Sequence, residues 1–101
     1  MSALQWLGGT EKDLEIRGLL VGLWQDRKGS LYEVSAGSTP TILSVATTRP
    51  DGQRRCTRDL IDTRYDAAFW GRGAKQFVGT VAEDRVTWRR ERAVFNWMRL
   101  Q

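Results

Sequence analysis

Short apolar runs separated by turn residues fill most of this 101-residue chain. The run LLVGLWQ is followed by DRKG and then by SLYEVSA, in which apolar and polar residues alternate. Alternation with a period of two is typical of a half-buried strand, and a short polar turn containing Gly joins two such strands into a hairpin. Residues 18–36 therefore predict a β-hairpin.

A second hairpin signal lies in the middle of the chain, where TILSVATTR leads through RPDG to QRRCTRDLI. Pro50 fixes φ at a turn position, and Asp and Gly are favoured after it. The later runs AAFW, KQFVGTV, VTW and AVFNWMRL are separated by GRG, AEDR and RRER. Connections this short make neighbouring strands antiparallel.

Together these runs predict about eight short strands, at residues 18–25, 30–36, 40–48, 53–60, 66–70, 75–81, 85–89 and 93–100. The fold class is therefore all-β, with antiparallel strands in an up-and-down meander. We expect the meander to form a small closed or nearly closed barrel, because closure removes exposed edge strands. A two-sheet sandwich built from the same strands is the alternative.

The first residues have a different pattern. Thr10 followed by Asp13 resembles a capping box, and Leu14 and Ile16 could continue a short helical turn. We assign residues 1–17 to an N-terminal arm outside the barrel and residues 18–101 to a single β-barrel domain. The arm could cover one open end of the barrel.

The segments LWQDRKGSLYEV and FWGRGAKQFVGTV form a faint internal repeat. Each places a Trp, Trp24 or Trp70, before a Gly-containing turn and an aromatic residue after it. Duplication of a four-stranded unit and chance similarity both remain open.

Aromatic side chains supply much of the material for a core. The chain contains five Trp, three Phe and two Tyr residues, and each such ring buries roughly 150–250 Å² when enclosed. An eight-stranded barrel is just wide enough to be filled by side chains or to hold one small ligand. We expect a filled interior, with Trp24 and Trp97 buried. The inward positions expected are Leu20, Trp24, Tyr32, Val34, Leu43, Val45, Leu60, Trp70, Phe77, Val81, Val86, Trp88, Phe95 and Trp97.

The residues available for chemistry exclude most common hydrolase designs. The chain has no His, which excludes a Ser-His-Asp or Cys-His pair and any zinc site built on imidazole. The single Cys56 fits a half-buried strand position, and the neighbouring carboxylates Asp59 and Asp62 fall in or beside turns. We expect no catalytic residue, no metal and no cofactor, and hence a protein that is not an enzyme.

Cysteine content and hydropathy bear on localisation. One Cys cannot form an internal disulfide, and no run approaches the roughly 18 apolar residues that span a bilayer. The N-terminal residues lack the pattern of a signal peptide. The sequence therefore predicts a soluble, intracellular protein, cytoplasmic by default, with no membrane partner.

Arginine dominates the positive charge. Of 16 basic residues, three are Lys and the rest are Arg, and the net charge is +4. Arg stacks on aromatic rings and forms bidentate pairs with carboxylates or phosphates. One basic cluster is Arg54, Arg55 and Arg58, and acidic residues lie close to it in the sequence.

A second Arg cluster lies among aromatic residues near the end of the chain. Trp and Arg are over-represented at the energetic centres of protein interfaces, so we expect a non-catalytic module that binds a protein partner through an exposed aromatic and Arg surface. The candidate surface or barrel-mouth residues are Trp70, Arg72, Trp88, Arg89, Arg90 and Arg92. Nucleic-acid binding through the Arg clusters is a further alternative, expected to be weak, and a homo-oligomer is also open.

Two short motifs suggest how the barrel closes. Gly22-Leu23-Trp24 is a G-x-W in the first predicted strand, and Trp97-Met98-Arg99 ends the last. This pair resembles the calycin type of barrel, which includes the lipocalins and avidin-like proteins, where a first-strand Trp packs across the closed end against an Arg from the last strand. The resemblance implies that Gly22, Trp24, Trp97 and Arg99 close the barrel. It also implies, as an alternative function, the binding of a small hydrophobic ligand inside.

Overall fold

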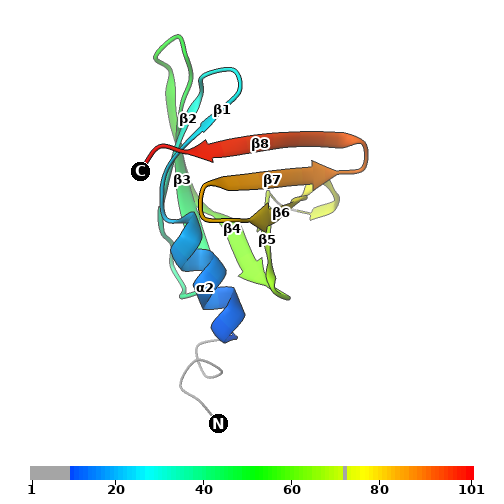
Figure 1. Cartoon of the computed structure of the whole chain (residues 1–101). Coiled ribbons are helices and arrows are strands. Elements are labelled where there is room, and N and C mark those ends of the chain that lie inside the picture. Colours follow the sequence, from blue (N-terminus) through cyan, green and yellow to red (C-terminus); the bar gives the residue numbers. More distant parts are fainter. Residues whose placement is uncertain (1–9, 72) are drawn as a thin grey trace.

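Eight antiparallel strands form a closed barrel with one short helix beside it (Figure 1). The structure is a computed structural model that describes residues 10–71 and 73–101. In chain order the elements are α2 (Glu11–Leu20), β1 (Gly22–Asp26), β2 (Leu31–Ala36), β3 (Ile42–Thr48), β4 (Arg54–Arg64), β5 (Ala67–Trp70), a 3₁₀ turn (Gly73–Lys75), β6 (Phe77–Val81), β7 (Arg85–Arg90) and β8 (Ala93–Arg99). Each strand pairs with the next, and β8 pairs back with β1. The predicted meander and its closure are confirmed, and the sandwich alternative is wrong.

The helix occupies part of the first predicted strand. Residues 18–20 form the last turn of α2, so β1 begins at Gly22 and not at residue 18. The predicted capping box is present: the Thr10 hydroxyl accepts from the Asp13 amide at 3.0 Å, and the Asp13 carboxylate accepts from the Thr10 amide at 3.2 Å. Among the residues that the structure describes, no helix has the length and apolar character that crossing a membrane requires.

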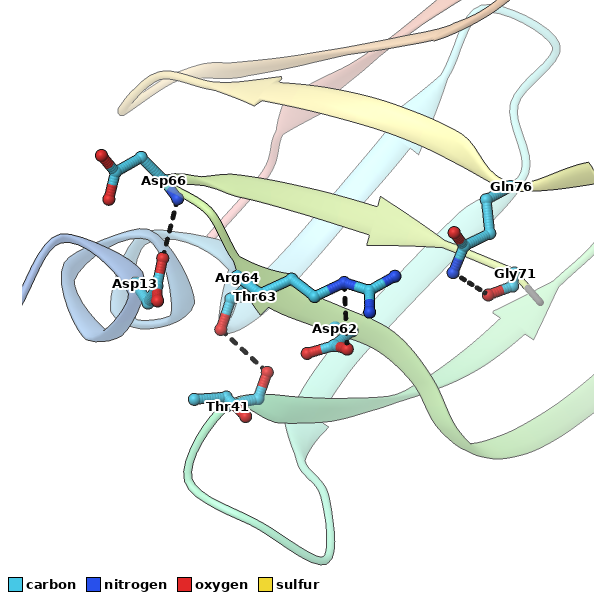
Figure 2. Close-up of polar contacts among 8 residues, drawn as sticks. All are labelled: Asp13, Thr41, Asp62, Thr63, Arg64, Asp66, Gly71 and Gln76. Atoms are coloured by element: carbon cyan, nitrogen blue, oxygen red, sulfur yellow. Dashed lines mark hydrogen bonds and ion pairs between the residues drawn. The ribbon is translucent and has the colours of Figure 1, made fainter. Parts of the chain in front are cut away.

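Helix α2 packs across one end of the barrel. Ile16 and Leu20 are buried and belong to the apolar core. The second oxygen of the Asp13 carboxylate accepts a hydrogen bond from the Asp66 amide at 2.9 Å, which ties the helix to the turn between β4 and β5 (Figure 2). The same side chain therefore starts the helix and docks it.

Aromatic rings fill the barrel interior, as the sequence predicts. Trp24, Trp88 and Trp97 are fully buried, and the Trp97 ring lies 5.1 Å from the Trp88 ring and 4.5 Å from the Tyr32 ring. Gly79 lies opposite Trp88 on β6, and a Cβ there would come within 2.6 Å of the indole ring. The large ring on one strand thus needs a residue without a side chain on its neighbour.

A bulge interrupts the pairing of β4 with β3. Leu43 pairs with Ile61 and Val45 pairs with Thr57, so several β4 residues lie opposite one residue of β3. Ile61 and Thr63 are fully buried, whereas Leu60, expected to point inward, is only partly buried. The bulge adds two residues to β4, an even number, so Thr57, Ile61 and Thr63 share the inner face. Leu60 lies next to Ile61 in the strand and packs against the core without being fully buried.

Buried Thr63 is compatible with the core because its hydroxyl is satisfied. The Thr63 Oγ1 donates to the Thr41 carbonyl oxygen at 2.8 Å (Figure 2). A buried hydroxyl without such a partner would be costly. The contact also joins the end of β4 to the segment before β3.

Candidate binding site at the barrel mouth

Arg99 is the centre of the closed end of the barrel. Its guanidinium carbon lies 4.3 Å from the centre of the Trp24 ring. The same guanidinium donates to the carbonyl oxygens of Glu83 at 2.7 Å, Gln101 at 3.0 Å and Leu19. One side chain on β8 therefore links β1, the β6–β7 turn and the end of α2.

Gly22 and Trp24 complete this end. The indole nitrogen of Trp24 donates to the Leu20 carbonyl oxygen at 2.8 Å. Gly22 has φ of 142°, and a Cβ on it would lie 2.4 Å from the Gln101 carbonyl oxygen. In the G-x-W, Gly22 has no side chain where the backbone passes close to Arg99 and Gln101. Trp24, two residues later, provides the ring that the Arg99 guanidinium stacks on.

The opposite end of the barrel is open and contains a cleft of about 690 Å³. The cleft lies between the tip of the β1–β2 hairpin and the first half of β8. Its lining residues are Gln25, Asp26, Arg27, Lys28, Tyr32, Arg49, Trp70, Val94, Phe95, Asn96 and Met98. We call this the mouth cleft.

Aromatic rings form the apolar part of the mouth cleft. The Trp70 ring lies 5.7 Å from the Tyr32 ring and 5.6 Å from the Phe95 ring, in both cases edge to face. Trp70 also contacts Trp97 of the core at 5.0 Å. The rings are therefore held by the core beneath them and do not need a ligand to order them.

Asp26 organises the polar part of the cleft. One oxygen of its carboxylate accepts from the amides of Lys28 at 3.0 Å and Ser30 at 2.9 Å, and the other accepts from the Tyr32 hydroxyl at 2.7 Å. Burial, then the hydrogen bond from Tyr32 to Asp26 and the charge of that carboxylate, raise the pKa of Tyr32 to about 12. Tyr32 is therefore a neutral hydroxyl at physiological pH.

Three cationic side chains line the cleft together with this carboxylate. Arg27 and Lys28 are exposed in the β1–β2 turn, and Arg49 donates from Nη1 to the Ser30 hydroxyl at 3.2 Å. The cleft lining thus has three cationic side chains and one carboxylate that already accepts three hydrogen bonds. The lining therefore has an excess of positive charge.

A smaller pocket of about 220 Å³ adjoins the mouth cleft and is lined by Trp70, Gly71, Lys75, Phe77 and Phe95. Trp70 and Phe95 line both spaces. The loop above it is held at two points. Gln76 donates from its side-chain amide to the Gly71 carbonyl at 3.1 Å (Figure 2), and Arg90 donates to the Lys75 carbonyl at 3.1 Å.

The structure separates the residues of the expected aromatic and Arg surface. Trp70 lies at the mouth, but Trp88 is fully buried and contributes no exposed ring, because its side chain faces the core beneath Gly79. Arg90 is half-buried over the Phe77 ring at 4.6 Å, while Arg89 and Arg92 are exposed. Arg72 lies outside the described residues.

The other basic cluster is also divided. By strand register Arg55 pairs with Thr47, which pairs with Tyr32, so Arg55 lies on the inner face of the sheet, whereas Arg54 lies on the outer face. Arg54 pairs with Glu33 at 3.6 Å, and Arg58 is exposed. Cys56, expected to be half-buried, is exposed.

Sequence reasoning missed the polar half of the mouth cleft. Asp26 stands out only as part of a turn, and Tyr32 and Phe95 only as inward residues. Arg49 gives no signal beyond preceding Pro50. The available signal is Asp26 followed by Gly29 in the turn and by Tyr32 at the second position of the next strand. At this spacing the Asp26 carboxylate can reach the Tyr32 hydroxyl.

No family model, curated protein or solved structure matches the chain. Within residues 10–71 and 73–101, no group of three or more Cys, Asp and Glu side chains is placed to hold a metal ion.

Proposed function

We propose that this protein is a non-catalytic binding protein whose mouth cleft holds an amphipathic anionic ligand. The observation that carries the proposal is a cleft of about 690 Å³ with an aromatic floor and a cationic rim. Ligand sites of proteins measure about 300–1,000 Å³ and are mostly apolar with a few polar groups. The site differs from the ligand cavity that a calycin-like barrel implies, because Trp rings fill the interior and the ligand binds above them.

The aromatic floor favours a flat apolar group on the ligand. Trp70 presents a partly buried ring between Tyr32 and Phe95, and all three are braced by the core. A planar group bound there buries apolar area on both partners without loss of side-chain freedom in the protein.

The rim favours an anionic group on the same ligand. Arg49 presents a planar guanidinium that suits a carboxylate or sulfonate, and Arg27 and Lys28 add charge at the opening. Asp26 and Tyr32 do not act as a base here, because Asp26 already accepts three hydrogen bonds and the pKa of Tyr32 is raised to about 12. These groups orient a ligand, which supports binding without turnover.

The test is a titration with 1-anilinonaphthalene-8-sulfonate (ANS), a flat aromatic anion. A ligand of about 20 non-hydrogen atoms at about 0.3 kcal/mol each binds with a Kd of tens of micromolar. We expect saturable one-to-one binding in this range, and competition by 2-naphthoate. The neutral 2-naphthamide should compete roughly tenfold less well.

A matched pair of double variants locates the site. Arg49→Gln with Lys28→Gln removes two charges from the rim, whereas Arg85→Gln with Lys12→Gln removes two from β7 and α2, outside the cleft. We expect the first to weaken ANS binding about tenfold, close to 1.4 kcal/mol, and the second to leave it unchanged. Equal effects of the two doubles, or no saturable binding, would refute the proposal.

A further inference from the structure

One edge of β8 is unpaired beside the mouth cleft. The β7–β8 ladder covers six residue pairs, from Arg85↔Met98 to Arg90↔Ala93, but the β1–β8 ladder covers only three and stops at Asp26↔Trp97. Asp26 is the cause, because its carboxylate and backbone close the turn that directs the chain into β2. The first half of β8 therefore has a neighbour on one side only.

The backbone groups that face this gap follow from the strand's alternation. The Arg99 amide donates to Asp84 on the β7 side, and the Leu100 amide donates to Leu23 on the β1 side. Successive residues of a strand direct their amide and carbonyl groups to opposite sides, so Val94 and Asn96 direct theirs toward the gap. Within the described part of the chain, no strand pairs with either residue on that side.

An unpaired strand edge of this kind is a template for another strand. Val94 and Asn96 present two amides and two carbonyls, and the pairs are about 6.7 Å apart, the repeat of a second extended chain. The cleft beside them has the aromatic floor on the inner face and Val94 and Met98, both exposed, on the outer face. A chain added here would place alternate side chains on these two surfaces.

Charge selects among the chains that could add. Arg27, Lys28 and Arg49 line the cleft across from β8, against the single carboxylate of Asp26. A partner strand that carries Asp or Glu gains from these cations, and a basic strand is repelled.

We propose that the natural ligand of the mouth cleft is a short, extended, acidic segment of another protein that adds to Val94–Asn96 of β8 as an edge strand. This inference rests on the proposed function and names the chemistry of its ligand. Backbone hydrogen bonds supply a sequence-tolerant part of the affinity, and the aromatic floor and the cationic rim supply selectivity. The partner is thus recognised by its main chain as well as by its side chains.

The probes are acetylated, amidated pentapeptides of the form Glu-X-Z-X-Glu, with X and Z drawn from Val, Thr, Leu and Phe. We expect at least one to bind and to displace ANS, and its counterpart with Lys in place of Glu to bind at least tenfold more weakly. Two N-methylated forms of the best peptide make a matched pair. One is methylated at the backbone amides of the odd-numbered residues and the other at those of the even-numbered residues. One should lose at least tenfold in affinity and the other should lose little, because only every second amide faces β8.

Two variants of the protein test the same edge. Asn96→Pro removes the amide that faces the cleft without removing one that faces β7, and an edge position tolerates Pro. Asn96→Ala keeps that amide and is the control. We expect Asn96→Pro to weaken the peptide at least tenfold and Asn96→Ala to change it little.

Hydrogen exchange provides a readout that survives if Asn96→Pro does not fold. Bound peptide should slow exchange of the Val94 and Asn96 amides at least tenfold, while the Phe95 amide, which faces β7, serves as the internal control. If ANS binds but no peptide does, or if both N-methylated forms bind equally, the strand proposal is wrong and the proposed function stands. If neither ANS nor a peptide binds, both are wrong.

Discussion

The guanidinium of Arg99 lies 4.3 Å from the centre of the Trp24 ring and joins the first and last strands of the barrel. The contact is enclosed by backbone carbonyls on three segments, which accept from the same guanidinium. The planar guanidinium of Arg can stack on the Trp24 ring and donate to these carbonyl oxygens at the same time, whereas the ammonium group of Lys cannot do both.

Arg99→Met should therefore destabilise the protein by about 2–4 kcal/mol. The variant loses charge-assisted hydrogen bonds and the cation–π contact, and leaves carbonyl oxygens without donors. Urea unfolding followed by fluorescence measures the change. Arg99→Lys should still lose more than half as much unfolding free energy as Arg99→Met does. Arg85→Met, on the exposed face of β7, should change the unfolding free energy little. A loss for Arg99→Met no larger than that of Arg85→Met would contradict the role given to this residue.

Gly22 and Gly18 should respond to Ala in opposite directions. At Gly22 the new Cβ would lie 2.4 Å from the Gln101 carbonyl oxygen, and φ is 142°, so we expect a loss of about 2 kcal/mol or more. At Gly18, inside α2, nothing lies within 4 Å and Ala should stabilise by roughly 0.5–1 kcal/mol. Thermal unfolding of the two variants checks both signs, and a stabilising Gly22→Ala would show that the close approach is not real.

Trp24 and Trp70 should separate stability from binding. Trp24 is fully buried, and Trp24→Ala should cost about 3–5 kcal/mol. Trp70 is only partly buried at the mouth, so Trp70→Ala should cost less stability but abolish most ANS binding. Urea unfolding and ANS titration of the two variants provide the comparison. An unchanged melting temperature for Trp24→Ala would mean that this ring does not support the core.

The Tyr32–Asp26 pair should make stability depend on pH in the alkaline range. The pKa of Tyr32 rises from 10.0 to about 12 in the folded chain, so the folded state holds this proton more tightly than the unfolded state. The stabilisation is complete below pH 10.0 and is lost as pH rises toward about 12. Tyr32→Phe removes the effect, so the difference in unfolding free energy between the wild type and this variant should shrink across that window. A difference that stays constant with pH would exclude the assigned shift.

Nucleic-acid binding should be limited to low salt. The arginines at positions 54, 55 and 58 are divided between two faces of β4, and Glu33 pairs with the first of them. We expect no submicromolar affinity for RNA or DNA at about 0.15 M salt, because dispersed charges give few simultaneous phosphate contacts. A filter-binding assay across salt concentrations measures this. Submicromolar binding that is lost when these three residues are changed to Glu would make nucleic acid the better assignment.

The sequence predicts the strands better than it predicts the site. Turn residues and alternation are local, so the hairpins, the antiparallel meander and the inward positions of Trp24 and Trp97 follow from them directly. Closure does not, because a sandwich can be built from the same strands, and it is expected only because it removes free edges. Leu60 is less buried than expected because it neighbours Ile61, whose side chain is buried on the inner face, and successive residues of a strand point to opposite faces. Trp88 is expected both among the inward residues and as a candidate surface residue. The inward expectation is confirmed and the surface one is wrong, because the ring is fully buried beneath Gly79 of β6.

The mouth cleft is harder to predict because it depends on where pairing stops. Asp26 ends β1, Arg49 follows β3, and Phe95 lies on the last strand. Only the register of β1 against β8 shows that the ladder ends at Asp26 and leaves a gap. Such a gap depends on the relative lengths of two strands that are distant in sequence, and no local pattern encodes it.

The hydrogen bond from Arg99 to the Leu19 carbonyl oxygen joins residues that are 80 positions apart in the sequence. Apart from the β1–β8 pair, all paired strands are consecutive in the sequence. Loop closure makes distant pairing slow, so we expect the hairpins to form first and the β1–β8 seam to form last. Until it does, the chain is an open sheet with two free edges, and it is at this stage that two molecules can exchange β8 or pair edge to edge. We therefore expect Arg99 to shorten the lifetime of that open state, and substitutions there to increase aggregation during refolding even where the folded barrel survives.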